Sequence, residues 1–159
     1  MKTANKTLEI DSKEGLEIID ITDEVKASVK ESGIKNGLVN IQTQHTTATV
    51  FVQENEPLLL KDIKNLLRKV VSEEIEYNHD NFEIRTVNMC EGECQNGHSH
   101  CKSLFFPTAV TLNLFEDEIQ FGRWQRVLFI ELDRAKSISS CFPFLNSPTL
   151  NFIVFCTSI

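Results

Sequence analysis

The amino-acid sequence predicts a single domain of the α+β class, a mostly antiparallel β-sheet with two or three helices. Three observations lead to this fold class. The chain has 159 residues, a length that suits one hydrophobic core. Short runs rich in β-branched and aromatic residues recur between turn signals, as strands do. Two longer segments carry apolar residues at helical spacing.

The N-terminal third of the chain predicts two short strands and one helix. Residues 8–10 and 16–19 have strand-like composition, and the polar turn between them favours a hairpin. Ile21, Val25 and Val29 then recur at four-residue spacing, with Thr22 as the expected N-cap and Gly33 at the expected C-cap. This pattern predicts an amphipathic helix between residues 22 and 32.

The next segment predicts two strands followed by a second helix. Residues 38–44 alternate apolar and polar side chains, which places Val39, Ile41 and Thr43 on one face. Residues 47–52 are a nearly continuous apolar run, typical of a strand buried on both sides. Asn55, Glu56 and Pro57 then supply a cap, an acid and an N1 proline. The apolar stripe of the helix that follows consists of Leu59, Ile63, Leu66, Leu67 and Val70.

The second half of the chain predicts a long loop and then several strands. Residues 72–97 are polar and acidic, and a loop of this length inside a domain is usually functional or mobile. Strand patterns resume at residues 104–106, 110–115, 119–121 and 127–132. The tail, residues 135–159, is rich in Ser and Phe, and only residues 151–155 regain a strand pattern.

Charge and composition exclude several classes of protein. The net charge of −7 argues against a nucleic-acid binder, which needs a basic surface. The first residues lack the apolar region of a signal peptide, and no apolar run is long enough to cross a bilayer, so we expect a cytoplasmic protein. Five cysteines at irregular spacing then indicate free thiols or metal ligands rather than a disulfide framework.

Histidines are the first candidate site residues, because imidazole is the commonest transition-metal ligand in proteins. His45, His79 and His100 would form a catalytic metal site with one open position if the fold brought them together. The alternative is that each is an ordinary surface or hydrogen-bonded histidine. The spacing Cys90-x3-Cys94-x3-His98-x-His100 suggests a structural zinc site, although it matches none of the usual finger patterns.

Other polar residues have a functional and a structural interpretation. Glu54 follows a buried-looking strand and would act as a general base or metal ligand, whereas Asp62 taken alone is a solvated helix residue. Lys102 and Ser103 would hold a phosphate group. The single tryptophan, Trp124, is either core or a stacking platform for a heteroaromatic ring, in which case the neighbouring Gln125 would read the edge of that ring.

Taken together, these motifs resemble the YjbQ family, whose members are described as secondary thiamine-phosphate synthases. The order and spacing hold from the first strand to Glu131, through Gln44-His45-Thr46-Thr47-Ala48, Glu54-Asn55, Asp62, Tyr77-Asn78-His79-Asp80, His100-x-Lys102-Ser103 and Gly122-x-Trp124-Gln125. The resemblance makes residues 1–159 one YjbQ-like domain with a divergent tail over 135–159. It implies an α+β fold, a homotrimer and a histidine metal pocket near a subunit interface.

The resemblance also implies the site residues and a reaction. The metal ligands would be His45, His79 and His100, with a zinc-like ion or magnesium as the divalent cofactor. Pocket and support residues would be Glu54, Asp62, Lys102, Trp124 and Gln125. Glu54, Asp62 and Lys102 would be catalytic, and Trp124 and Gln125, together with Ser103, would bind the substrate. The activity would be a transferase reaction of thiamine biosynthesis that joins a pyrimidine methyl diphosphate to a thiazole phosphate. Alternatives are a metal-dependent hydrolase that uses a metal-bound water, with Glu54 as base, and a non-enzymatic metal-binding trimer.

Overall fold

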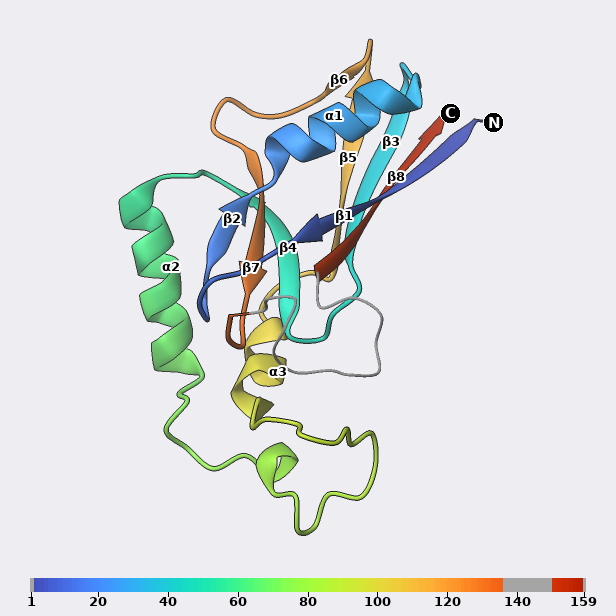
Figure 1. The fold of residues 1–159 in the computed structure, drawn as a ribbon. Helices are drawn as coiled ribbons and strands as arrows, with labels where there is room; N and C mark the ends of the chain where they lie inside the picture. The colour runs from blue at the N-terminus through green and yellow to red at the C-terminus, as the bar shows by residue number, and fades with distance from the viewer. Residues whose placement is uncertain (1, 136–149, 159) are drawn as a thin grey trace.

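Two antiparallel sheets form the frame of the molecule (Figure 1). The computed structural model describes residues 2–135 and 150–158. The larger sheet has the order β1-β8-β3-β5-β6, and the smaller sheet has the order β2-β7-β4. The strands of the larger sheet are β1 (Thr3–Ile10), β8 (Leu150–Ser158), β3 (Gly37–Thr43), β5 (Ala109–Phe115) and β6 (Glu118–Ile119). Those of the smaller sheet are β2 (Ile18–Asp20), β7 (Arg126–Glu131) and β4 (Ala48–Gln53).

Strand β7 separates two apolar clusters, because successive side chains of a strand point to opposite faces of its sheet. Val127 and Phe129 belong to the cluster formed with α1 (Thr22–Ser32) and the larger sheet. Leu128 and Ile130 belong to the second cluster, which includes Leu67 of α2 (Pro57–Val70). The small sheet is therefore covered by α2 on one face and by the rest of the fold on the other (Figure 1).

Helix α1 forms where its apolar spacing predicts it, with one change at its start. Its N-cap position is Ile21, and the side chain of Asp20 accepts a hydrogen bond from the Thr22 N–H at 3.0 Å. The Thr22 hydroxyl instead accepts a hydrogen bond from the Val127 N–H at 2.9 Å. Gly33 ends the helix in the left-handed region with φ +60°, as expected for a glycine C-cap.

Helix α2 begins with Glu56 rather than Asn55 as its cap. The Glu56 carboxylate accepts hydrogen bonds from the N–H groups of Leu58 and Leu59, and these bonds lower its pKa. The predicted apolar stripe is only partly buried. Leu67 packs in the core, whereas Leu66 is 60% exposed and Val70 is 52% exposed. None of the helices in the described residues is long and apolar enough to cross a membrane.

The predicted N-terminal hairpin is wrong. Strand β1 pairs with β8 over eight residues, from Thr3↔Thr157 to Ile10↔Leu150, whereas β2 pairs with β7 in the other sheet. Strand β8 pairs with β1 along its full length, whereas three-residue β2 could pair with only part of it. The predicted strand pattern at residues 151–155 falls within β8. Residues 136–149 of the predicted divergent tail lie outside the described residues.

The predicted strand at residues 104–106 is also wrong. Helix α3 (Gly97–Ser103) leads into this segment. The N–H groups of residues 104–106 donate back to the carbonyls of Cys101, Lys102 and Ser103. Phe106 then packs on Phe51, with ring centroids 5.1 Å apart. These local hydrogen bonds replace the ladder that a strand would need. The predicted long loop contains a 3-10 helix, η1 (Asn78–Asp80), and ends where α3 begins.

We expect replacement of Phe129 by Ala to lower the free energy of unfolding by about 3–5 kcal/mol, because it leaves a cavity in a fully buried strand. Phe115→Ala is the matched control, since this ring is 57% exposed and its loss should cost less than about 1 kcal/mol. Urea unfolding followed by circular dichroism measures both values. Equal losses in the two variants would contradict the two-sided burial of β7.

Candidate functional site

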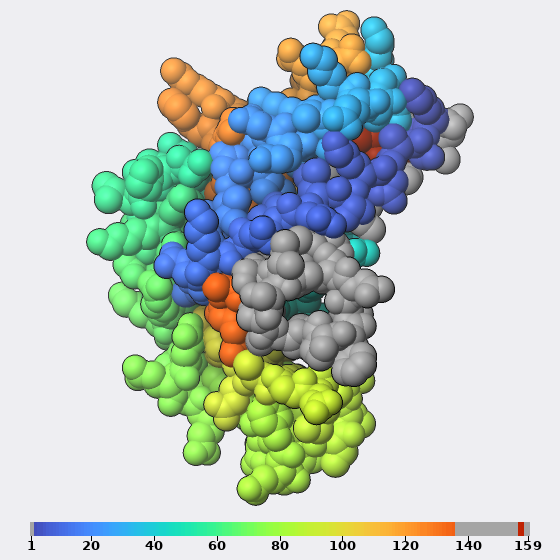
Figure 2. All heavy atoms as spheres, viewed as in Figure 1, coloured from blue at the N-terminus to red at the C-terminus, as the bar shows by residue number. Residues whose placement is uncertain are grey.

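Several candidate site residues gather beyond one end of the small sheet. Figure 1 shows α3 and η1 beyond the ends of β7 and β4, and Figure 2 shows that the segment around them forms a lower lobe of the molecule. The backbone of Leu132, just after β7, joins the loop before β4 to helix α3. Its N–H donates to the Thr47 carbonyl at 3.0 Å, and its carbonyl accepts from the Ser99 hydroxyl at 2.9 Å. The loop that contains His45 and helix α3 are therefore both attached to the same residue.

Two of the three predicted histidines meet in this lobe. The rings of His79 and His100 lie edge to face, with centroids 4.5 Å apart. Burial lowers the pKa of His100, and the neighbouring His79 and Arg85 lower it further. The His79 Nε2 atom is buried and has no hydrogen-bond partner among the described residues. The pair is therefore a partly desolvated imidazole site.

The start of α3 holds this histidine pair in place. One oxygen of Asp80 accepts hydrogen bonds from the N–H groups of Asn96 and Gly97, both at 2.8 Å. The contact requires glycine at position 97, because a Cβ there would lie 2.5 Å from the Tyr77 Cβ and 3.1 Å from the Asp80 Oδ2. The close approach of η1 and α3 brings residues that are about 20 positions apart into one site.

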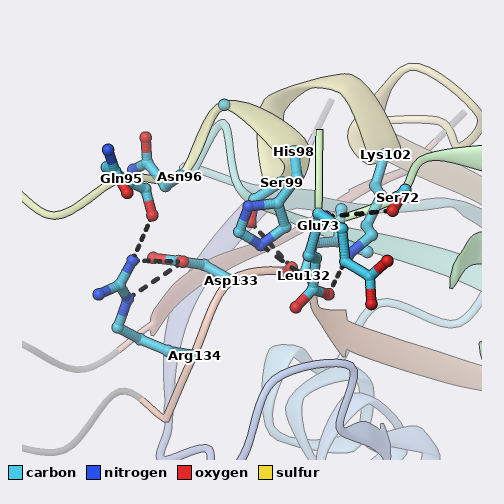
Figure 3. A network of polar contacts seen from close by, with 12 residues as sticks. Ser72, Glu73, Gln95, Asn96, His98, Ser99, Lys102, Leu132, Asp133 and Arg134 are labelled. Carbon is cyan, nitrogen blue, oxygen red and sulfur yellow. Dashed lines mark hydrogen bonds and ion pairs between the residues drawn. The ribbon is translucent and has the colours of Figure 1, made fainter. Parts of the chain in front are cut away.

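Lys102 is fully buried and forms an ion pair with Glu73 (Figure 3). The hydrogen bond from the lysine lowers the pKa of Glu73. His98 lies against the same carboxylate, with its Nε2 4.0 Å from Glu73 Oε1. Burial lowers the pKa of His98, and the charge of Lys102 lowers it further. Lys102 is thus already committed to a carboxylate, which disfavours its predicted role in holding a phosphate.

Arg85 and Arg134 organise the rest of the lobe, and sequence reasoning singled out neither. Arg85 Nη1 donates to Glu93 at 2.7 Å and to the His79 carbonyl at 3.2 Å. Arg134 donates to the Gln95 carbonyl at 2.6 Å beside its ion pair with Asp133 (Figure 3). The available signal was that Arg85 is the one Lys or Arg between residues 73 and 96, a segment with seven acidic residues.

The remaining candidates do not all lie in this lobe. Gln53 pairs with Arg126 at one end of the small sheet, and Ala48 pairs with Glu131 at the other. Glu54 directly follows Gln53, and Trp124 and Gln125 directly precede Arg126, so all three lie at this first end of the sheet. Helix α3 lies at the other end, and the length of β4, about 20 Å, separates it from them. Asp62 is exposed on α2.

The contacts of the other candidates are mainly local. Trp124 is 61% exposed, and the Arg123 guanidinium lies 4.8 Å from its ring. Gln125 accepts a hydrogen bond from the Gly122 N–H at 2.8 Å. The Ser103 hydroxyl donates to the His100 carbonyl at 2.7 Å. His45 is half-buried in the loop between β3 and β4, and its N–H donates to the Thr43 hydroxyl at 3.2 Å.

We expect Gly97→Ala to destabilise the protein by about 1–3 kcal/mol, because the new methyl group forces Tyr77 and Asp80 away from α3. Gly122→Ala is the control, since its Cβ would meet only the flexible Gln125 side chain, at 3.3 Å. Thermal unfolding and limited proteolysis after residue 76 measure the effect. If both variants unfold at the same temperature, the close packing of η1 on α3 is not as described.

The free energy of unfolding should fall between pH 7 and pH 5. His98 and His100 have pKa values lowered by burial, so the unfolded chain binds more protons in this range than the folded chain. Their contribution is present above the ordinary histidine pKa and is lost as the pH falls through the folded values. Urea titrations at pH 7, 6 and 5 measure the slope. A His98→Gln/His100→Gln double variant should have a flatter slope, and an unchanged slope would contradict this assignment.

Comparisons with known proteins place the chain in a family. The profile described as "UPF0047 protein YjbQ-like" matches residues 6–142. A UPF0047 protein of Archaeoglobus fulgidus is 33% identical over 118 residues, 74% of this chain and 82% of the relative. The UPF0047 protein YugU of Bacillus subtilis is 32% identical over 129 residues, 80% of this chain and 89% of the relative.

Solved structures share the fold. A YbjQ-like protein of unknown function from Sulfolobus solfataricus superposes with a TM-score of 0.82 at 23% identity, covering 99% of both chains. A hypothetical protein from Aeropyrum pernix gives a TM-score of 0.72 at 23% identity, covering 100% of both chains. These likenesses confirm the α+β fold class.

The predicted function is corrected by these findings. The matching descriptions name a UPF0047 family and a protein of unknown function, with no thiamine-phosphate synthase. Among residues 2–135 and 150–158, no group of three or more His, Cys, Asp or Glu side chains is arranged to hold a metal ion. Within these described residues, His45, His79 and His100 do not form such a group, and neither do Cys90, Cys94, His98 and His100. The synthase, the metal-water hydrolase and the three-histidine metal protein lose their physical basis.

The family itself was predicted correctly from the motifs, and the profile covers most of the chain, including every candidate site residue. This chain belongs to the UPF0047 family of YjbQ-like proteins.

Proposed function

We propose that this protein binds a small, positively charged organic molecule in a cavity between the segment after α2 and the start of α3. The cavity has a volume of ≈ 850 Å³, within the range of small-molecule sites. It is lined by Glu73, Glu74, Ile75, Glu76, Tyr77, Asn78, Asp80, Asn81, Phe82, Glu83, Gln95 and His98. The observation that carries the proposal is the charge of this lining: five carboxylates and no Lys or Arg.

Three of these carboxylates are not neutralised by the described part of the protein. Lys102 compensates Glu73, and two backbone N–H groups stabilise Asp80. Glu74, Glu76 and Glu83 form no ion pair with any residue in 2–135 or 150–158. His98 adds little positive charge because its pKa is lowered by burial. A concave wall with excess negative charge raises the local concentration of cations.

Aromatic side chains favour an organic cation over a simple ion. Tyr77 and Phe82 both line the cavity, and Ile75 adds apolar surface. An ammonium group gains from the faces of aromatic rings as well as from carboxylates. The apolar part of an amine would bury surface against these side chains, which a hydrated inorganic ion cannot do.

The predicted phosphorylated substrate and the predicted divalent metal ion remain proposals, and each is subject to a condition. A small phosphorylated substrate suits this cavity only if it also carries a cationic group, because the lining repels a free phosphate. A divalent metal ion would be held from this chain by His79 and His100, since the His79 Nε2 atom has no partner among the described residues. Two imidazoles leave the other coordination positions to water, to the ligand or to a second copy.

A homotrimer and a cytoplasmic location complete the proposal. Exposed apolar side chains on α2 and after α3 support an assembly, with Leu66 60% exposed and Leu104 82% exposed. Equilibrium sedimentation of the purified chain tests the trimer. A monomer at micromolar concentration would contradict it without affecting the cavity, whose lining comes from one chain.

Three probes that share a benzyl group and differ in charge test the charge preference of the cavity. Benzylamine should bind more tightly than benzyl alcohol, benzyl phosphate should not bind, and the affinity for benzylamine should fall as salt rises. A Glu76→Gln/Glu83→Gln double variant should weaken benzylamine binding by about threefold or more, and Glu118→Gln, on distant β6, should not. Calorimetry and NMR shifts at Tyr77 and Phe82 measure binding. Equal affinity for the amine and the alcohol would contradict the proposal.

A further inference from the structure

Cys90 begins a tight turn in the lower lobe, and Cys94 directly follows the last residue of that turn, Glu93. The Glu93 N–H donates to the Cys90 carbonyl at 3.2 Å, and the Cys90 N–H donates back to the Glu93 carboxylate at 3.2 Å. Gly92, within the turn, has φ +74° in the left-handed region. The Cys94 thiol lies 3.9 Å from the Gly92 carbonyl, so its side chain points back over the turn.

This geometry favours a disulfide between Cys90 and Cys94. A turn closed by a hydrogen bond from residue i+3 to residue i holds the Cα atoms of those residues, here Cys90 and Glu93, less than about 7 Å apart. A disulfide needs Cα atoms roughly 4.4–6.8 Å apart. Cys94 directly follows the last residue of the turn, and its Sγ lies over the turn, on the side of the chain where Cys90 begins it.

The environment makes this pair the most accessible site of oxidation among the cysteines that the structure describes. Cys90 is exposed and Cys94 is half-buried. Cys101 lies half-buried on α3. Cys156 is buried on β8, and burial raises the pKa of its thiol, so little reactive thiolate forms there.

We propose that Cys90 and Cys94 form a reversible disulfide by exchange with a low-molecular-weight disulfide such as glutathione disulfide. The Cys90 thiolate attacks one sulfur, which forms a mixed disulfide and releases one glutathione thiolate. The Cys94 thiol then loses its proton to solvent and attacks the Cys90 sulfur, which releases the second glutathione. Two cysteine thiols are oxidised to one disulfide, and one glutathione disulfide is reduced to two thiols.

The disulfide would act on the histidine pair through Arg85. Glu93 lies inside the loop that the new bond closes, and its carboxylate holds Arg85 at 2.7 Å. Arg85 in turn donates to the carbonyls of His79 and Asn88. Oxidation removes conformations in which Glu93 swings away, so η1 opens less often. This step does not depend on what the cavity binds.

Mass spectrometry of the full chain tests the site directly. A Cys141→Ser background removes the cysteine that lies outside the described residues. After incubation with glutathione disulfide and alkylation, the tryptic peptide of residues 86–102 should lose two hydrogen atoms and carry one alkyl group, on Cys101. Adding Cys101→Ser should preserve the disulfide. Adding Cys94→Ser should leave glutathione attached to Cys90.

Three outcomes would overturn the inference. These are alkylation of both Cys90 and Cys94 after oxidation, a glutathione adduct that never resolves, and a bond from either cysteine to Cys101. Hydrogen exchange at residues 78–84 tests the coupling to Arg85. It should slow at least about threefold in the oxidised protein and recover with dithiothreitol. An Arg85→Lys variant should form the disulfide and lose this protection, and unchanged exchange in the wild type would remove the coupling.

Discussion

The burial of β7 on both faces is the constraint on which the rest of the structure depends. Residues Val127 to Glu131 are all buried, so every peptide group of this strand must find a partner inside the protein. Strands β2 and β4 supply partners along its length. Where β4 ends, the backbone of Leu132 continues the pattern with Thr47 and Ser99. Helix α3 is thus placed by the hydrogen-bonding requirement of a buried strand end.

A second constraint follows from the placement of α3, because it buries the amine of Lys102. A charged group removed from water must be paired, and Glu73 is the carboxylate that pairs with it. Glu73 belongs to the segment that leaves α2, so the pairing attaches this segment to α3 (Figure 3). The buried Lys102 therefore positions Glu73, one of the residues that line the cavity. Within residues 2–135 and 150–158, the neighbouring Glu74 and Glu76 form no ion pair.

Local patterns in the sequence predicted the elements whose packing is local. The alternation of Val39, Ile41 and Thr43 gives β3, and the spacing of Val25 and Val29 gives α1. The pairing of β1 with β8 joins the two ends of the chain, and a short turn at residues 11–15 favoured a nearer partner. Nothing in a single strand records which distant strand completes its ladder.

The sequence likewise predicted the part of the candidate site that depends on local contacts. The motifs identified His79 and His100, which do meet, because Asp80 binds the backbone at the start of α3. They also grouped Glu54 and Trp124 with the histidines, although β4 separates the two sets. A motif preserves the order of residues along the chain and not the sheet that lies between them. The role of Lys102 depends on burial, which residue type alone does not give.

The charge of the lower lobe connects the cavity, the histidine pair and the cysteine turn. Residues 73–96 contain seven acidic side chains and one arginine, and Arg85 binds Glu93 and three backbone carbonyls. Lys102 adds one more cation from α3. Like charges on the lining of one cavity are unfavourable to each other. The cation proposed for the cavity would offset this unfavourable charge.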